Sequence, residues 1–153
     1  MNMKKIILCA VFSLAATLAF AQVRCDSGNF DIEMTYKRTV VRGNEAMIDF
    51  TLTNISGKEI KIDMDDERNR AYDDEGNCYP SHHFKFDVAN TGSKGCILPP
   101  DTPVKLRCII KDIDEYATVF TRMELSYFMN CYNYFTTAAL QKMSIKNIEF
   151  TRD

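Results

Sequence analysis

The stretch I-D-F-T-L-T-N-I-S-G-K-E-I-K-I-D-M, residues 48–64, decides the fold class of this chain. Apolar side chains occupy every second position on both sides of a short polar segment, Asn54–Lys58. Alternation with a period of two is typical of a β-strand that buries one face, and a segment rich in Asn, Ser and Gly is typical of a turn. The stretch therefore predicts a β-hairpin with one face in water.

The same alternation recurs along most of the chain and is separated by segments rich in Gly, Asn, Asp and Pro. The strands expected from it are residues 30–36, 48–53, 60–64, 84–87, 104–110, 121–127 and 148–150, with a short hairpin at 71–79. A single helical turn is expected at 112–118, and no long amphipathic helix is indicated. About seven or eight short strands at this spacing are typical of an all-β antiparallel sandwich or barrel.

The first 21 residues have the character of an export signal. Lys4 and Lys5 precede an apolar run at 6–20, and Ala19-Phe20-Ala21 is a small-x-small cleavage site. We predict a Sec signal peptide at 1–21, cut before Gln22, and one domain at 22–153. The apolar run is shorter than the roughly 20 residues of a membrane span, so no stable membrane anchor is expected after cleavage. The expected location is the periplasm or the exterior of a bacterium.

The charge of the mature chain excludes some classes of partner. Without Lys4 and Lys5 it has 17 basic and 21 acidic residues, and its net charge is −4. Nucleic-acid binding uses a basic stripe, and docking on anionic lipid uses a basic cluster. We therefore expect neither nucleic acid nor a membrane surface as a partner.

Five cysteines follow the predicted cleavage site, and disulfides persist in an exported protein. An odd number leaves at least one thiol free or paired between chains. Cys108 alternates with Val104, Leu106 and Ile110, which predicts a buried, inert thiol. No C-x-x-C spacing indicates a redox motif or a zinc ribbon.

Three segments occur in an order that resembles a known group of proteins. They are F-T-L-T-N-I-S-G-K-E-I-K-I at 50–62, A-Y-D-D-E-G-N-C-Y at 71–79 and I-L-P-P-D-T-P-V-K-L at 97–106. This order resembles the small secreted bacterial immunoglobulin-like proteins of the immunoprotective extracellular type and their relatives. The resemblance implies an immunoglobulin-like antiparallel β-sandwich outside the cytoplasm, and it implies no catalytic residue.

That fold also suggests a disulfide pattern. In an immunoglobulin-like sandwich the first strand often lies beside the last, so Cys25 and Cys131 are expected at the same end. Cys78 and Cys96 bracket one loop-rich segment. We predict the pairs Cys25–Cys131 and Cys78–Cys96, although five cysteines allow other pairings.

The acidic stretch D-D-E-G-N at 73–77 raises the possibility of a calcium loop. An EF-hand places oxygen ligands at positions 1, 3 and 5, glycine at 6 and a bidentate Glu at 12. With Gly76 at position 6, position 1 is Ala71 and position 12 is His82, so two ligands are missing. A turn in which Gly76 takes the left-handed conformation is the favoured interpretation. A different calcium site remains as an alternative, formed by Asp63, Asp65, Asp73, Asp74 and Glu75.

No motif for a catalytic nucleophile is present, because the sequence lacks G-x-S-x-G, H-E-x-x-H and a P-loop. His82 and His83 are the near-neutral bases that an enzyme would depend on. Neighbouring residues of a strand point to opposite faces, so the two rings would chelate one ion only in a loop. We predict no catalytic residue and no cofactor.

The densest aromatic segment is S-Y-F-M-N-C-Y-N-Y-F at 126–135. Aromatic side chains on exposed loops stack on sugars or anchor protein partners, whereas those on a strand pack in the core. If a binding surface exists, its candidate residues are Tyr127, Phe128, Tyr132, Tyr134 and Phe135.

These observations together predict an exported, non-catalytic binding domain with an unknown protein or glycan as its partner. A small extracytoplasmic enzyme or enzyme inhibitor that uses loop residues is one alternative. A calcium-stabilised, adhesin-like module is another.

Overall fold

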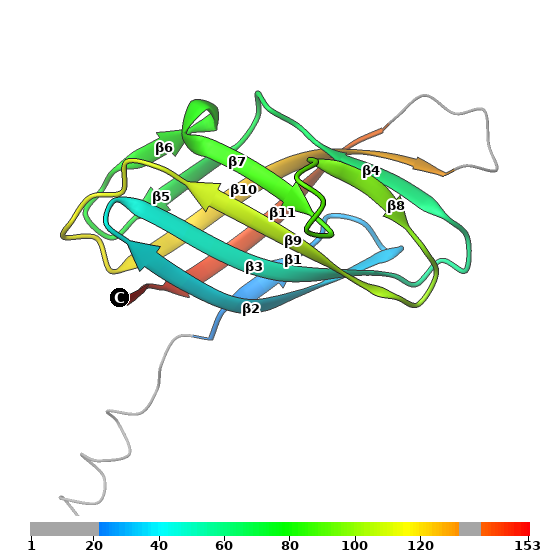
Figure 1. Cartoon of the computed structure of the whole chain (residues 1–153), viewed down its shortest axis with the longest axis horizontal. Helices are drawn as coiled ribbons and strands as arrows, with labels where there is room; N and C mark the ends of the chain where they lie inside the picture. Colours follow the sequence, from blue (N-terminus) through cyan, green and yellow to red (C-terminus); the bar gives the residue numbers. More distant parts are fainter. Residues whose placement is uncertain (1–21, 132–138) are drawn as a thin grey trace, which may run out of the picture.

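The computed structural model of the chain describes residues 22–131 and 139–153. It confirms an immunoglobulin-like antiparallel β-sandwich, because two sheets pack face to face over one apolar core. Figure 1 shows β2, β3 and β9 of one sheet crossing in front of β10 and β11 of the other. The predicted signal peptide, 1–21, lies outside the described residues.

The larger sheet has seven strands in the described part of the chain. They are β1 (Arg24–Asp26), β4 (Ile60–Met64), β5 (Arg70–Asp73), β6 (Cys78–Pro80), β8 (Gly95–Leu98), β10 (Val119–Cys131) and β11 (Ala139–Glu149). Strand β10 pairs along one edge with β11. Along its other edge it pairs first with β5 and then with β4, which lie end to end. Every other strand of this sheet is therefore placed relative to β10.

The smaller sheet has five strands in the order β12-β2-β3-β9-β7. They are β2 (Ile32–Arg42), β3 (Glu45–Asn54), β7 (Phe84–Val88), β9 (Pro103–Ile110) and β12 (Thr151–Arg152). A single 3₁₀ turn, η1 (Ser81–His83), joins β6 to β7. No helix in the described residues is long and apolar enough to cross a membrane.

The core lies between the sheets and follows the predicted alternation. Ile48, Phe50 and Leu52 of β3 face inward, and Met123 and Leu125 of β10 face them across the sandwich; all five are fully buried. Such a side chain contributes roughly 1.5–3 kcal/mol when it leaves water. The two strands predicted from residues 48–64 are therefore present, but the predicted hairpin is wrong, because β3 and β4 belong to different sheets and do not pair with each other.

The strand near the end of the chain is longer than expected from the sequence. A short strand at 148–150 was expected, whereas β11 runs for eleven residues and pairs along most of β10. Asn147 has a φ of +61°, and the buried positions change from Met143 and Ile145 to Ile148 around it. The buried residues thus change from odd to even positions, so the strict alternation that predicts a strand is interrupted. Strands β1, β8 and β12 are too short to show a period.

The strand register contradicts both predicted disulfides. Cys25 lies in the same row of the sheet as Met123, whereas Cys131 is eight positions further along β10. At about 3.3 Å per residue this is about 26 Å, far beyond the Cα separation of roughly 4.4–6.8 Å that a disulfide needs.

Cys78 and Cys96 are separated in the same way. They lie in the rows of Arg122 and Met129, which are seven positions apart on β10. Cys25, Cys78 and Cys96 have free thiols. Cys108 is also free and lies in the core as predicted, and burial raises the pKa of its thiol.

A cluster of charges fixes the outer face of the smaller sheet. Arg107 donates two hydrogen bonds to Asp49, from Nε at 2.8 Å and from a terminal nitrogen at 3.0 Å. Arg38 donates a third at 2.9 Å, and Lys105 lies 3.6 Å away. Burial acts to raise the pKa of Asp49, but these hydrogen bonds and charges outweigh it and hold the pKa at about 2. The carboxylate thus ties together β2, β3 and β9.

We predict that Asp49→Asn lowers the free energy of unfolding by about 2 kcal/mol at pH 7. The folded pKa lies below the unfolded value of about 3.9, so this stability is complete above that value and is lost as the pH falls toward 2. Urea unfolding of the wild type and the variant between pH 2 and 7 measures the difference. A control is Glu33→Gln, an exposed residue on the same face. A loss of stability that does not change with pH would contradict the prediction.

Candidate functional site

The structure places the predicted aromatic residues in different environments. Tyr127 is fully buried, and its hydroxyl donates to the carbonyl oxygen of Ser27 at 2.8 Å. Its inclusion in a binding surface was wrong, because its position on β10 points into the core. Phe128 points outward and is paired with Leu140. Tyr132, Tyr134 and Phe135 lie outside the described residues.

The acidic stretch at 73–77 is a turn between β5 and β6. Oδ1 of Asp73 accepts the backbone N–H groups of Glu75 and Asn77, both at 2.9 Å, and Oδ2 accepts the Tyr79 hydroxyl at 2.6 Å. Gly76 has a φ of +87°, which suits glycine. Burial acts to raise the pKa of Asp73, but the hydrogen bonds from Tyr79 and Asn77 outweigh it and lower the pKa. Each oxygen of Asp73 thus has a structural role.

The other acidic candidates also have protein partners or lie elsewhere. Asp74 accepts the backbone N–H groups of Thr118 and Val119 at 2.8 and 3.2 Å. Asp65, beyond the end of β4, pairs with Arg68 at 3.1 Å. No group of three or more His, Cys, Asp or Glu side chains in the described residues is arranged to hold a metal ion. The five acids proposed for calcium are therefore not brought together.

We predict that Asp73→Ala lowers the free energy of unfolding by about 2–4 kcal/mol, because it leaves the Tyr79 hydroxyl and the backbone N–H group of Asn77 without their acceptor. Thermal melts in EDTA and in millimolar calcium measure the change, and the loss should be the same in both. Glu75→Ala is the control, because this side chain is exposed in the same turn. A calcium-dependent rise in Tm that Asp73→Ala abolishes would favour the adhesin-like alternative.

The histidine pair lies on η1 and does not face the buried cysteine. The ring centroids of His82 and His83 are 4.2 Å apart. His83 Nδ1 is 3.0 Å from the carbonyl oxygen of Lys111. Cys108 has no exposed surface, so these rings and that thiol do not form an accessible catalytic pair.

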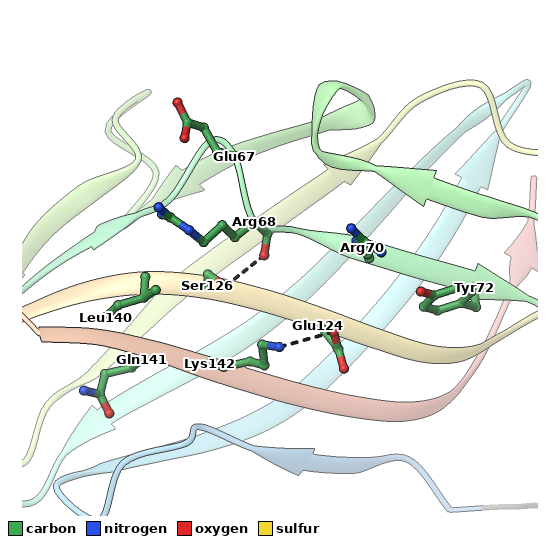
Figure 2. A pocket seen from close by; sticks show the side chains of 9 residues that line it. All are labelled: Glu67, Arg68, Arg70, Tyr72, Glu124, Ser126, Leu140, Gln141 and Lys142. Carbon is green, nitrogen blue, oxygen red and sulfur yellow. Dashed lines mark hydrogen bonds and ion pairs between the residues drawn. The ribbon is translucent and has the colours of Figure 1, made fainter.

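A groove crosses the outer face of the larger sheet, on the side away from the core. It has a volume of about 510 Å³ and runs over β5, β10 and β11 (Figure 2). Figure 2 shows Ser126 and Glu124 on β10, with Arg70 and Tyr72 on one side and Lys142 on the other. Its lining residues are Glu67, Arg68, Arg70, Tyr72, Glu124, Ser126, Leu140, Gln141 and Lys142.

The acidic side chain in the middle of the groove is held by basic neighbours. Glu124 contacts Arg122 at 2.5 Å and Lys142 at 3.5 Å, and its side chain is only 19% exposed. Burial acts to raise the pKa of Glu124, but the hydrogen bond from Arg122 and the nearby charges outweigh it and lower the pKa. Glu124 therefore stays ionised and fixes both basic side chains.

Arg70 differs from the other basic residues of the groove. It is exposed on β5 and lies opposite Glu124 in the register. No carboxylate in the described part of the chain lies within ion-pair distance of its guanidinium, whereas Arg68 has Asp65. The guanidinium of Arg70 is thus a cation whose N–H donors are available to a ligand in the groove.

Tyr72 lines both this groove and a second hollow. The second hollow has a volume of about 480 Å³ and is lined by Tyr72, Thr121, Arg122 and Glu124. Tyr72 is half-buried, so part of its side chain faces solvent. The two hollows are therefore neighbours that share Tyr72 and Glu124 in their walls.

Sequence reasoning missed this site. The residues were visible as the outward positions Arg122, Glu124 and Ser126 between buried ones, and as the basic residues of the 65–70 loop. The missing information was the register, which sets β5 and β11 on opposite edges of β10. Nothing in the sequence states that pairing.

No protein-family model matches the sequence. A search of the curated proteins also finds no match.

Several solved structures resemble the fold at low sequence identity. A PapD-like domain of human CEP192 has a TM-score of 0.46 and 8% identity, over 83% of this chain and 88% of that domain. The CooA pilin subunit of enterotoxigenic Escherichia coli has a TM-score of 0.37 and 10% identity, over 80% and 99%. A family 123 glycoside hydrolase of Clostridium perfringens has a TM-score of 0.45 and 7% identity, over 80% of this chain but 28% of the hydrolase. These likenesses concern the fold alone.

Proposed function

We propose that the chain is an exported, non-catalytic binding domain whose binding surface is the outer face of β5, β10 and β11. The observation that supports this proposal is the groove, which is lined by the half-buried Tyr72 and by Arg70, whose guanidinium has no carboxylate partner among the described residues. Concave surfaces with a few convergent polar groups are the usual sites of binding. The export signal at 1–21 would deliver the domain to the periplasm or the cell exterior.

We also propose a relationship to the protein family that the sequence resembles. The domain would be a relative of the small secreted immunoglobulin-like proteins of the immunoprotective extracellular type, with a partner outside the cytoplasm. The strand pairing and ion pairs of the site support a binding role. Its central strand is paired on both edges, and Arg122 and Lys142 are fixed by Glu124. A preorganised surface loses little entropy on binding.

We predict that the double variant Arg70→Ala/Tyr72→Ala loses binding at least tenfold while its Tm stays close to that of the wild type. Both side chains point out of the sheet, so their removal leaves the core intact. The mature domain, Gln22–Asp153, is applied to an array of soluble glycans and of envelope proteins from bacteria, and affinities are measured for each probe that the wild type retains.

The matched control is Lys111→Ala/Tyr116→Ala, which removes one basic and one aromatic side chain from exposed positions outside the groove. It should bind as the wild type does. Retention of every probe by the groove variant, or a wild type that binds none of them, would count against the proposed function.

A further inference from the structure

We propose that the groove recognises an acidic saccharide, with a sugar carboxylate on Arg70 and the ring of a neighbouring sugar against Tyr72. This inference rests on the proposed function and names the class of ligand for the same surface. It follows from three features of the groove: the charges that line it, the fully paired backbone of β10 in its floor, and the aromatic side chain of Tyr72.

The charges of the groove favour an anionic group at Arg70. The groove is lined by three basic residues, Arg68, Arg70 and Lys142, and by two acidic residues, Glu67 and Glu124. The second hollow adds a further basic residue, Arg122. Arg68, Lys142 and Arg122 already have carboxylate partners within the protein, whereas Arg70 has none in the described residues. A guanidinium binds a carboxylate through two parallel hydrogen bonds, which makes Arg70 the anchoring residue for an acidic ligand.

The floor of the groove favours a hydroxyl-rich ligand over a peptide. An extended peptide that binds a sheet gains its main-chain hydrogen bonds at a free strand edge. Here the floor is the face of β10, whose backbone is paired with β11 on one edge and with β5 and β4 on the other. The polar groups that remain available are side chains.

Those side chains suit sugar hydroxyl groups. The Glu124 and Glu67 carboxylates accept hydrogen bonds from hydroxyls, and the amide of Gln141 both donates and accepts. The ionised side chains of an acidic peptide offer these two carboxylates no hydrogen-bond donor. Hydroxyls spaced around an acidic sugar give the carboxylates donors at positions where such a peptide has none.

Tyr72 gives the apolar contact that a sugar ring needs. Its side chain lines both hollows, and Arg70 and Arg122 lie on β5 and β10 close to it. Aromatic rings present a large rigid surface with a polar end, and such surfaces stack on the C–H face of sugars. Tyr72 lines both hollows, so a linear saccharide that occupies both contacts this ring.

The test is isothermal titration calorimetry, in which the mature domain is titrated with oligogalacturonate of four units. The matched probe is the same oligosaccharide after its carboxylates have been reduced to neutral hydroxymethyl groups. We expect binding of the acidic probe, at least tenfold weaker binding of the reduced probe, and a fall in affinity between 50 and 300 mM salt. Arg70→Gln should lose at least tenfold, Arg70→Lys should recover part of the loss, and Lys111→Ala/Tyr116→Ala should bind normally.

The outcomes separate the ligand class from the proposed function. Equal binding of the acidic and reduced probes, lost in Arg70→Ala/Tyr72→Ala, would overturn the acidic class and leave the groove as the binding surface. Binding of the acidic probe that the groove variants do not change would overturn both proposals. Absence of binding to either probe would overturn the saccharide assignment, and the array of envelope proteins would then decide the function.

Discussion

The alternation of side chains along β10 is the constraint on which both the core and the candidate site depend. Met123, Leu125 and Tyr127 point inward and are fully buried, whereas Arg122 and Glu124, which alternate with them, point outward. A shift of one residue in the pairing would exchange the two sets, placing charges in the core and apolar side chains in the groove. The buried face therefore fixes the register, and the register in turn fixes the geometry of the groove.

Features that depend on local order could be predicted from the sequence, whereas those that depend on pairing could not. The turn at 73–77 was predicted because Asp73 and Gly76 favour a turn through local interactions that do not depend on strand pairing. The disulfides were wrong because they required knowledge of which strands are neighbours. The groove was missed for the same reason. Arg70 and Lys142 are far apart in sequence, and only the pairing of β5 and β11 with β10 places them on either side of one groove.

Charged groups have different tasks on the two outer faces of the sandwich. On the smaller sheet the buried carboxylate of Asp49 is satisfied by Arg38 and Arg107, so charge is used to hold strands together. On the larger sheet Glu124 fixes Arg122 and Lys142, but the neighbouring Arg70 is left without a carboxylate in the described chain. An exposed cation at a concave surface is available to a ligand, and this contrast distinguishes the two faces.

The most direct test is to map the binding surface by NMR, following backbone amide and arginine side-chain signals of the mature domain during titration with oligogalacturonate. We expect the shifts to concentrate on Arg70, Tyr72 and Glu124, to alternate along β10, and to be absent from the outer face of β3 and β9. Shifts confined to the smaller sheet or to the turn at 73–77 would contradict this expectation.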